Sequence, residues 1–203
     1  MRHDSGSLWV AIRIGAALVL LIGAVSLQAG MTEDSKDSGA ALISFDLPGE
    51  GFRWITVNDN VMGGRSSGGP EFVDGKLVFA GVTNTRGGGF SSVRTREQPW
   101  ELGSAKGLRV RVKGDGRVYR LDLRTDNRMG WRVVTYRAEF TTTAGQWIEV
   151  DLPFDQFSPS VFGQDMSGRT RALEPARIES LGFMIYDQKD GPFELEVDWI
   201  KAL

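Results

Sequence analysis

The chain of 203 residues is 41% hydrophobic and carries a formal net charge of −2, which suits one domain with a substantial core and gives no electrostatic reason to expect nucleic acid. It lacks cysteine, and its single histidine is His3. These two facts exclude disulfides, thiolate nucleophiles, cysteine-type zinc sites and His-paired serine nucleophiles. An enzyme of this composition would need carboxylates, Tyr or Lys for its proton transfers, and hydrolases and metalloenzymes are disfavoured. We predict a protein that is not an enzyme and assign it no cofactor and no metal ion.

Residues 1–30 have the pattern of a targeting segment. Arg2 and Arg13 precede an apolar run over residues 14–27, which is about 14 residues long and short for a membrane-spanning helix of about 20. Small residues at 24–26 and 29–30 offer cleavage sites. We predict a cleaved signal peptide or, as the second choice, an uncleaved N-terminal anchor that is the only membrane contact. Both predict an exported protein, periplasmic or membrane-anchored on the non-cytoplasmic side.

The remainder of the chain divides into a spacer and one domain. Residues 31–40 are polar and acidic and predict a disordered spacer, whereas over residues 41–203 apolar side chains recur at every second position, as in half-buried β-strands. Strands are predicted at residues 41–45, 54–57, 76–82, 108–112, 119–123, 134–140, 147–153, 178–186 and 193–199, with another opened by the glycines at 87–89. So many short strands without an internal repeat indicate a β-sandwich or barrel.

Three segments carry more specific expectations. The alternation on both sides of the turn at residues 114–116 predicts a hairpin whose charged side chains share one solvent face. Those charged side chains are Arg109, Arg111, Arg120, Asp122 and Arg124. Residues 178–186 are almost continuously apolar, which predicts a central strand. Residues 154–177 mix phenylalanine with proline and predict a packed irregular loop, with a short helical turn around 153–157.

The stretch over residues 54–69 runs from an apolar strand through Asn58 and Asp59 into two glycine pairs. Asn, Asp and Gly tolerate positive φ, and Asn and Asp side chains can bond to the backbone just ahead. Asn58, Asp59 and Ser66 therefore either bind a ligand or partner at a sandwich edge or hold the backbone of the turn, and turn chemistry favours the second hypothesis. The glycines assigned to structural turns are Gly63, Gly64, Gly88 and Gly89.

Charged residues give further binding candidates. Arg86 and Arg94 flank the glycine cluster and either recognise a carboxylate or sugar hydroxyl or are ordinary surface charges. Asp122 and Arg124 belong to an alternating charged face, which is either merely solvated or a binding surface. A turn containing Asp187 offers too few oxygen ligands to favour a calcium site.

The tryptophans are predicted mainly as core residues, because aromatic side chains dominate core burial. The set comprises Trp54, Trp100, Trp131, Trp147 and Trp199. Trp131 and Trp147 fall out of phase with their inward-pointing neighbours, so these two are the candidates for exposed, ligand-stacking side chains.

Several motifs together resemble those of one family. They are Trp54-x-x-Val57-Asn58-Asp59-x-Val61-Met62-Gly63-Gly64-x-Ser66, Gly88-Gly89-Phe90-x-Ser92-Val93-Arg94, Lys113-Gly-Asp-Gly-Arg117-x-Tyr119, Trp147 with Pro153-Phe154, and Leu181-Gly182-Phe183 to Gly191-Pro192-Phe193-x-Leu195. The chain resembles the thirty-kilodalton complex I intermediate-associated protein family, whose mitochondrial members assist the assembly of respiratory complex I. The resemblance covers residues 45–200. It implies a galactose-binding-like, jelly-roll β-sandwich and an assembly or chaperone-like role, with no catalytic residues to carry over.

Two functions are predicted from these observations. The first is a non-enzymatic, assembly-factor-like module that acts through contacts with an unidentified protein partner, as the family resemblance and the missing histidine and cysteine indicate. The alternative is a carbohydrate-binding β-sandwich module of the cell envelope. The candidate binding residues are Asn58, Asp59, Ser66, Arg86, Arg94, Asp122, Arg124, Trp131 and Trp147. Mitochondrial family members work on the matrix side, whereas the leader of this chain indicates export.

Overall fold

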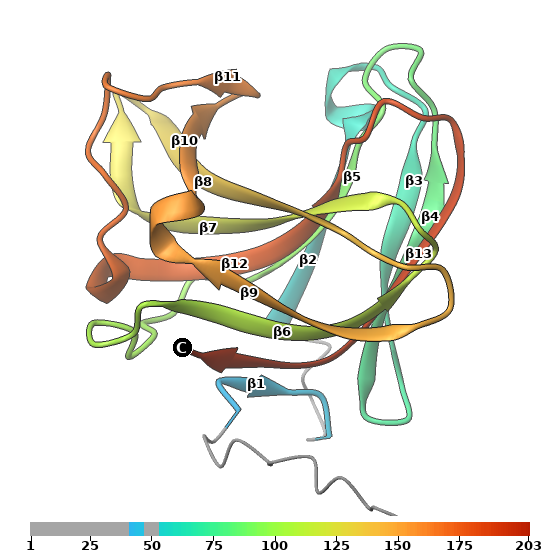
Figure 1. The fold of residues 1–203 in the computed structure, drawn as a ribbon. Helices are drawn as coiled ribbons and strands as arrows, with labels where there is room; N and C mark the ends of the chain where they lie inside the picture. The colour runs from blue at the N-terminus through green and yellow to red at the C-terminus, as the bar shows by residue number, and fades with distance from the viewer. Residues whose placement is uncertain (1–40, 47–52) are drawn as a thin grey trace, which may run out of the picture. The chain divides into compact units, whose positions relative to one another are not determined.

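The computed structural model describes residues 41–46 and 53–203, which form two antiparallel β-sheets (Figure 1). The six-stranded sheet has the order β3 (Ser67–Val73), β4 (Lys76–Thr83), β13 (Gly191–Ala202), β6 (Gly107–Gly114) and β9 (Trp147–Pro153), and β1 (Ile43–Ser44) pairs with β13. The seven-stranded sheet has the order β11 (Gln164–Asp165), β10 (Ser158–Val161), β8 (Arg132–Thr141), β7 (Val118–Met129), β12 (Ile178–Ile185), β5 (Ser91–Thr95) and β2 (Trp54–Asn58).

Short 3₁₀-helices are the only helices in the part of the chain that the structure describes. They are η2 (Asp59–Met62), η3 (Phe154–Gln156) and η4 (Pro175–Arg177). The predicted all-β sandwich is therefore confirmed, and η3 lies where a helical turn was expected. The predicted spacer and leader lie outside the described residues.

The core lies between the inner faces of the two sheets. On β7, Tyr119, Leu121 and Leu123 are fully buried, and the same alternation continues on β12 with Leu181 and Phe183. Both strands contribute to one hydrophobic cluster with residues of the six-stranded sheet. Because β12 lies between β5 and β7, the prediction that its apolar segment is a central strand is confirmed. Burying one face of each strand leaves the other face of each sheet free for polar side chains.

The prediction of a hairpin around residues 114–116 is wrong. β6 pairs with β9 and β13, whereas β7 pairs with β8 and β12, so the chain crosses from one sheet to the other at this turn. Arg109 and Arg111 consequently lie on the outer face of one sheet, and Asp122 and Arg124 on the outer face of the other. Two strands that bury opposite walls of one core show the same alternation as two strands of a hairpin, so the pattern alone cannot separate these cases.

Strand β3 was missed, because the glycine pair at its start was interpreted as part of a turn. Proline is tolerated there because β3 is an edge strand that pairs only with β4 along the sheet. Gly68 is paired with Gly81, and a Cβ on Gly81 would lie 2.1 Å from the carbonyl oxygen of Ser67 and 2.9 Å from the ring of Phe193. The glycines therefore let the ring of Phe193 pack closely against this edge of the sheet.

A bulge also changes the predicted phase of β13. The register shifts between Val197 and Trp199, so that Ile200 is fully buried while Trp199 is only half-buried. Of the other predicted core tryptophans, Trp54 and Trp100 are buried.

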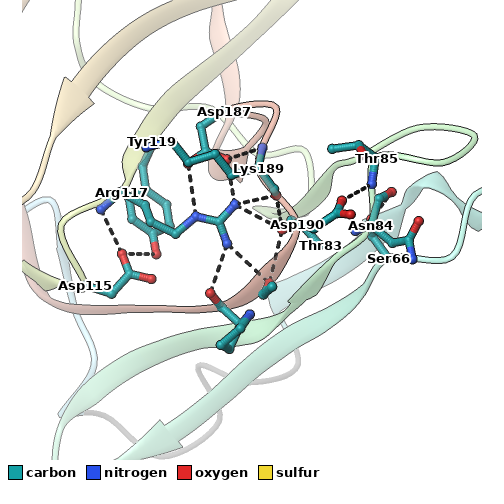
Figure 2. A network of polar contacts seen from close by, with 12 residues as sticks. Ser66, Thr83, Asn84, Thr85, Asp115, Arg117, Tyr119, Asp187, Lys189 and Asp190 are labelled. Atoms are coloured by element: carbon teal, nitrogen blue, oxygen red, sulfur yellow. Dashed lines mark hydrogen bonds and ion pairs between the residues drawn. The ribbon is translucent and has the colours of Figure 1, made fainter.

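The crossing from β6 to β7 is held by a polar network around Arg117 (Figure 2). Its guanidinium donates two hydrogen bonds to Asp187, of 2.6 Å and 3.0 Å, and others to the carbonyl oxygens of Lys189 and Pro192. Asp115 accepts hydrogen bonds from the backbone N–H of Arg117 and from the hydroxyl of Tyr119. Arg117 thereby ties the turn after β6 to the loop between β12 and β13. Asp187 is thus the ion-pair partner of Arg117.

Candidate functional site

The turn around Asp59 is densely hydrogen-bonded. The carboxylate of Asp59 is fully buried and accepts hydrogen bonds from the backbone N–H of Ser66 at 2.8 Å, the hydroxyl of Ser66 at 2.6 Å and the backbone N–H of Gly89 at 2.6 Å. Asn58 accepts from the hydroxyl of Ser91 and donates to the carbonyl oxygen of Gly68. These contacts fix η2 against the loop that precedes β5.

The four turn glycines meet two different needs. Gly63 and Gly89 have positive φ values of 85° and 93°, which residues with a side chain rarely adopt. Gly64 and Gly88 pack against Asp59 instead, since a Cβ on either residue would lie 2.2 Å or 2.4 Å from an atom of the Asp59 side chain. The expectation of positive φ was therefore incomplete: two of the glycines make room for a buried carboxylate.

The burial of Asp59 has a consequence for acid stability. Burial by itself raises the pKa of Asp59, but the hydrogen bonds from Ser66 and Gly89 outweigh it and lower the pKa below the usual 3.8. Because the folded pKa is the lower one, the stabilisation is complete above the unfolded pKa of about 3.9 and is lost as the pH falls through the folded pKa. We expect Asp59→Asn to be less stable than wild type at pH 7 and the difference to shrink below about pH 4.

Urea denaturation of both proteins between pH 7 and pH 2.5 measures this difference. A gap in unfolding free energy that stays constant over the whole range would contradict the proposed ionised, hydrogen-bonded carboxylate.

A cleft of about 530 Å³ lies on the outer face of the seven-stranded sheet. Its floor consists of side chains that alternate with the core residues of β5, β7, β8 and β12. The polar floor residues include Ser92, Arg94, Asp122, Arg124, Thr135, Arg137 and Ser180. Three of the predicted binding residues, Arg94, Asp122 and Arg124, thus come together in the floor of one cleft, and a fourth, Trp131, also lines it.

Two arginines of the floor lie near each other and near Asp122, but neither forms a close ion pair with a described residue. Arg94 on β5 and Asp122 on β7 are both paired with Gly182 of the intervening strand β12, and Arg124 is paired with Ser180. Because Gly182 has no side chain, no β12 side chain stands between the side chains of Arg94 and Asp122. Burial lowers the pKa of Arg94, and burial together with the charge of Arg94 lowers the pKa of Arg124 to about 10. Both guanidiniums remain charged at neutral pH.

The floor also contains a half-buried pair formed by Asp122 and Arg137. Arg137 Nε and Asp122 Oδ1 lie 3.3 Å apart, but neither atom makes a well-directed hydrogen bond with any described residue. Burial raises the pKa of Asp122, against the opposing charges of Arg137 and Arg124. Arg137 also donates a 3.0 Å hydrogen bond to the hydroxyl of Ser160. The floor therefore contains buried polar atoms, Asp122 Oδ1 and Arg137 Nε, that lack a hydrogen-bond partner among the described residues.

Exposed apolar side chains form two walls of the cleft. At one wall Trp131 and Phe162 are 78% and 70% exposed, their ring centroids lie 5.9 Å apart, and the guanidinium of Arg132 stacks over both rings. At the other wall η2 presents Val61 and Met62, which are 71% and 62% exposed. In Figure 1 the end that carries β11 and the end that carries η2 stand apart at the two upper corners of the view.

The remaining predicted site residues lie elsewhere. Trp147 is half-buried on the outer face of the six-stranded sheet, where the cations of Arg111 and Lys113 lie 5.0 Å and 5.4 Å from its ring centroid. Arg86 is exposed in the loop before β5 and does not line the cleft. Asn58, Asp59 and Ser66 do not line the cleft. Their hydrogen bonds hold η2, which carries Val61 and Met62.

Sequence reasoning missed Phe162 and Arg137 as cleft residues. Phe162 was expected inside a packed irregular loop, but it projects from the turn between β10 and β11 with a positive φ of 49°. The adjacent Phe162-Gly163 pair is a turn signal that could have marked it. Arg137 has the same out-of-phase position on β8 as Asp122 has on β7, so correct pairing of these strands would have found it.

The two packed antiparallel sheets define the fold class as a β-sandwich. Residues 43–197 match the family model described as Complex I intermediate-associated protein 30 (CIA30), and the chain belongs to this family. It is similar to the "Complex I intermediate-associated protein 30, mitochondrial" of Mus musculus, with 29% identity over 73% of this chain and 51% of that protein. The Drosophila melanogaster protein of the same name is 28% identical over 63% of this chain and 44% of that protein. The chain spans about half the length of these curated relatives.

A solved structure shares the fold. It is the family 11 carbohydrate-binding module of the cellulosomal cellulase Lic26A-Cel5E of Clostridium thermocellum, with a TM-score of 0.55 and 20% identity, covering 81% of this chain and 94% of that module. This likeness confirms the predicted jelly-roll sandwich.

The predicted location is contradicted by these comparisons. An exported protein, periplasmic or membrane-anchored on the non-cytoplasmic side, was expected from the leader, but the curated relatives are named as mitochondrial proteins. The leader pattern itself falls on residues outside those described. Within residues 41–46 and 53–203, no helix is long and apolar enough to cross a membrane. Nor do these residues contain a group of three or more His, Cys, Asp or Glu side chains placed to hold a metal ion.

Proposed function

We propose that the chain is a non-catalytic binding module that engages a protein partner through the cleft, in the manner of an assembly factor for complex I. One observation carries the proposal: of the seven large hydrophobic side chains that are exposed among the described residues, four line this single cleft. The four are Val61, Met62, Trp131 and Phe162. Exposed apolar side chains gathered in one place mark interaction sites more reliably than scattered ones.

The composition of the cleft suits a protein interface. Aromatic residues, methionine and arginine are enriched at such interfaces, and tryptophan and arginine dominate their binding energy. The names of the curated relatives connect them with intermediates of complex I, which supports a subunit or intermediate of that complex as the partner.

The same lining gives little support to catalysis. The cleft contains no histidine, cysteine or lysine, and its one carboxylate, Asp122, is paired with Arg137. Tyr186 also lines the cleft, but no hydrogen bond among the described residues joins its hydroxyl to Asp122, as a paired general acid and base would need.

The proposal is tested by removing the aromatic wall. We expect the double variant Trp131→Ala/Phe162→Ala to lose partner capture by at least about tenfold, since truncating a central interface aromatic commonly costs 2 kcal/mol or more. Because both side chains are exposed, the melting temperature should hardly change. Affinity capture from an extract of the source organism, quantified by mass spectrometry, and thermal unfolding of the full chain give the two readouts.

A matched control is available on the other sheet. Val73 and Val82 are each 48% exposed and lie outside the cleft, so Val73→Ala/Val82→Ala should capture the partner as wild type does. Equal loss of capture in both double variants, or no loss in either, would refute the cleft as the interface.

Carbohydrate binding is the second candidate function, and the exposure of Trp131 beside Arg and Asp side chains favours it. Trp147 no longer supports it, because two cations cover its ring. A glycan array probed with the full chain separates the candidates. A polysaccharide signal that disappears in Trp131→Ala would establish this second function, and an array without signal would exclude it for the polysaccharides tested.

A further inference from the structure

The electrostatics of the cleft contrast with those of the whole chain. Four arginines and one aspartate line the cleft, an excess of three positive charges, whereas the complete chain carries a net charge of −2. The lining arginines are Arg94, Arg124, Arg132 and Arg137. A positive cleft in an acidic protein is selective for a negatively charged occupant, because complementary potentials steer encounter and suppress wrong partners.

Two of the four cleft arginines already have partners within the protein, and two do not form a hydrogen bond or a close ion pair with a described residue. Arg137 is occupied by Asp122 and Ser160, and Arg132 lies over the rings of Trp131 and Phe162. Arg94 and Arg124 are half-buried, and neither makes a hydrogen bond or a close ion pair with any residue in the described ranges. Asp122 attracts both guanidiniums, but this single carboxylate is also paired with Arg137, so the two like charges in a partly desolvated floor leave an excess of positive charge that a bound anion would offset.

The occupant's chemistry follows from what surrounds this pair. Guanidiniums bind carboxylates through two parallel hydrogen bonds, so Arg94 and Arg124 together suit a carboxylate. A polyphosphate or nucleic acid fits less well, because the carboxylate of Asp122 lies in the same floor and would repel a dense polyanion. A neutral glycan would leave both charges uncompensated. The apolar walls at Trp131 and at Met62 suit apolar side chains on both sides of the acidic group.

We propose that the cleft recognises an extended acidic segment of the protein partner, in which an Asp or Glu carboxylate binds between Arg94 and Arg124 and flanking apolar side chains contact the two walls. This inference rests on the proposed function, since it specifies the chemistry of the partner that the cleft would bind.

A random heptapeptide library displayed on phage and panned against the full chain tests the inference. We expect enriched peptides to carry Asp or Glu flanked by apolar residues. Their enrichment should disappear with Arg94→Gln/Arg124→Gln and persist with Arg86→Gln/Arg169→Gln, which removes two exposed arginines outside the cleft. Thermal unfolding of both variants checks that the fold is retained.

One enriched peptide then gives the magnitude by isothermal titration calorimetry. Replacing its carboxylates with amides should weaken binding at least about tenfold, as should Arg94→Gln/Arg124→Gln, and the two losses should not add. Raising the salt concentration should weaken binding of the acidic peptide more than binding of the amide peptide.

The outcomes separate this inference from the proposed function. Three outcomes would overturn the acidic-segment inference. They are no enrichment, enrichment of peptides without acidic residues, and binding by Arg94→Gln/Arg124→Gln equal to that of wild type. If partner capture still depends on Trp131 and Phe162 in that case, the proposed function stands with a different partner chemistry. Phosphate- or glycan-dependent binding that requires Arg94 and Arg124 would likewise overturn the peptide assignment.

Discussion

Replacing Arg117 with methionine is expected to lower the free energy of unfolding of the full chain by about 3–5 kcal/mol, the cost typical of leaving one partner of a buried ion pair uncompensated. The Arg117 and Asp187 side chains are only 11% and 4% exposed, so water cannot replace the lost guanidinium. The pKa of Asp187 is at present lowered, since Arg117 outweighs the opposing effect of burial. Carbonyl oxygens of Lys189 and Pro192 lose their donor as well.

Urea denaturation measures this loss, and Arg120→Met is the matched control. Arg120 also donates two hydrogen bonds to one carboxylate, that of Glu139, but these side chains are 21% and 59% exposed. An exposed ion pair contributes roughly 0–1 kcal/mol, so Arg120→Met should cost no more than this. Similar losses for the two variants would contradict a special structural role of Arg117 at the crossing between the sheets.

The second large effect is expected for Gly64→Val. A Cβ at this position would lie 2.2 Å from Cγ of Asp59, so the buried carboxylate must move away from its donors. The backbone N–H groups of Ser66 and Gly89 would then be left unsatisfied, at about 1–3 kcal/mol each. We expect a total loss of roughly 3 kcal/mol or more, seen as a lower thermal unfolding midpoint.

Gly69→Ala is the control for this substitution. A Cβ on Gly69 meets only the hydroxyl of Thr56, at an ordinary contact distance of 3.5 Å, so its midpoint should stay close to that of wild type. An unchanged midpoint for Gly64→Val would show that the corner is a mobile loop, contrary to its dense hydrogen bonding.

The period-two pattern predicted most of the strands, because burial of alternate side chains is a local property of each strand. Residues 76–82 and 178–186 became β4 and β12 with nearly the expected bounds. Pairing was less predictable. The hairpin across residues 114–116 failed because the decisive contacts of Arg117 reach Asp187 and Lys189, some seventy residues away in sequence.

The site could be predicted only in part for the same reason. Arg94, Asp122 and Arg124 were named from their local positions, and the structure brings them together through β12. Arg137 joined them through strand pairing, which no local pattern specified, and Phe162 through a turn whose Phe162-Gly163 signal was not used. Trp147 shared its out-of-phase signal with Trp131 but lies on the other sheet, since phase identifies a face and not the sheet to which the face belongs.

Site-specific photocrosslinking tests most directly whether the cleft binds a protein. A p-benzoylphenylalanine side chain is introduced at position 131 or, as the comparison, at position 147, and the full chain is irradiated in an extract of the source organism. A protein adduct of defined mass from position 131, competed by an excess of wild-type chain and absent from position 147, is the expected result. Adducts from position 147 alone, or the same adducts from both positions, would contradict a binding site in the cleft.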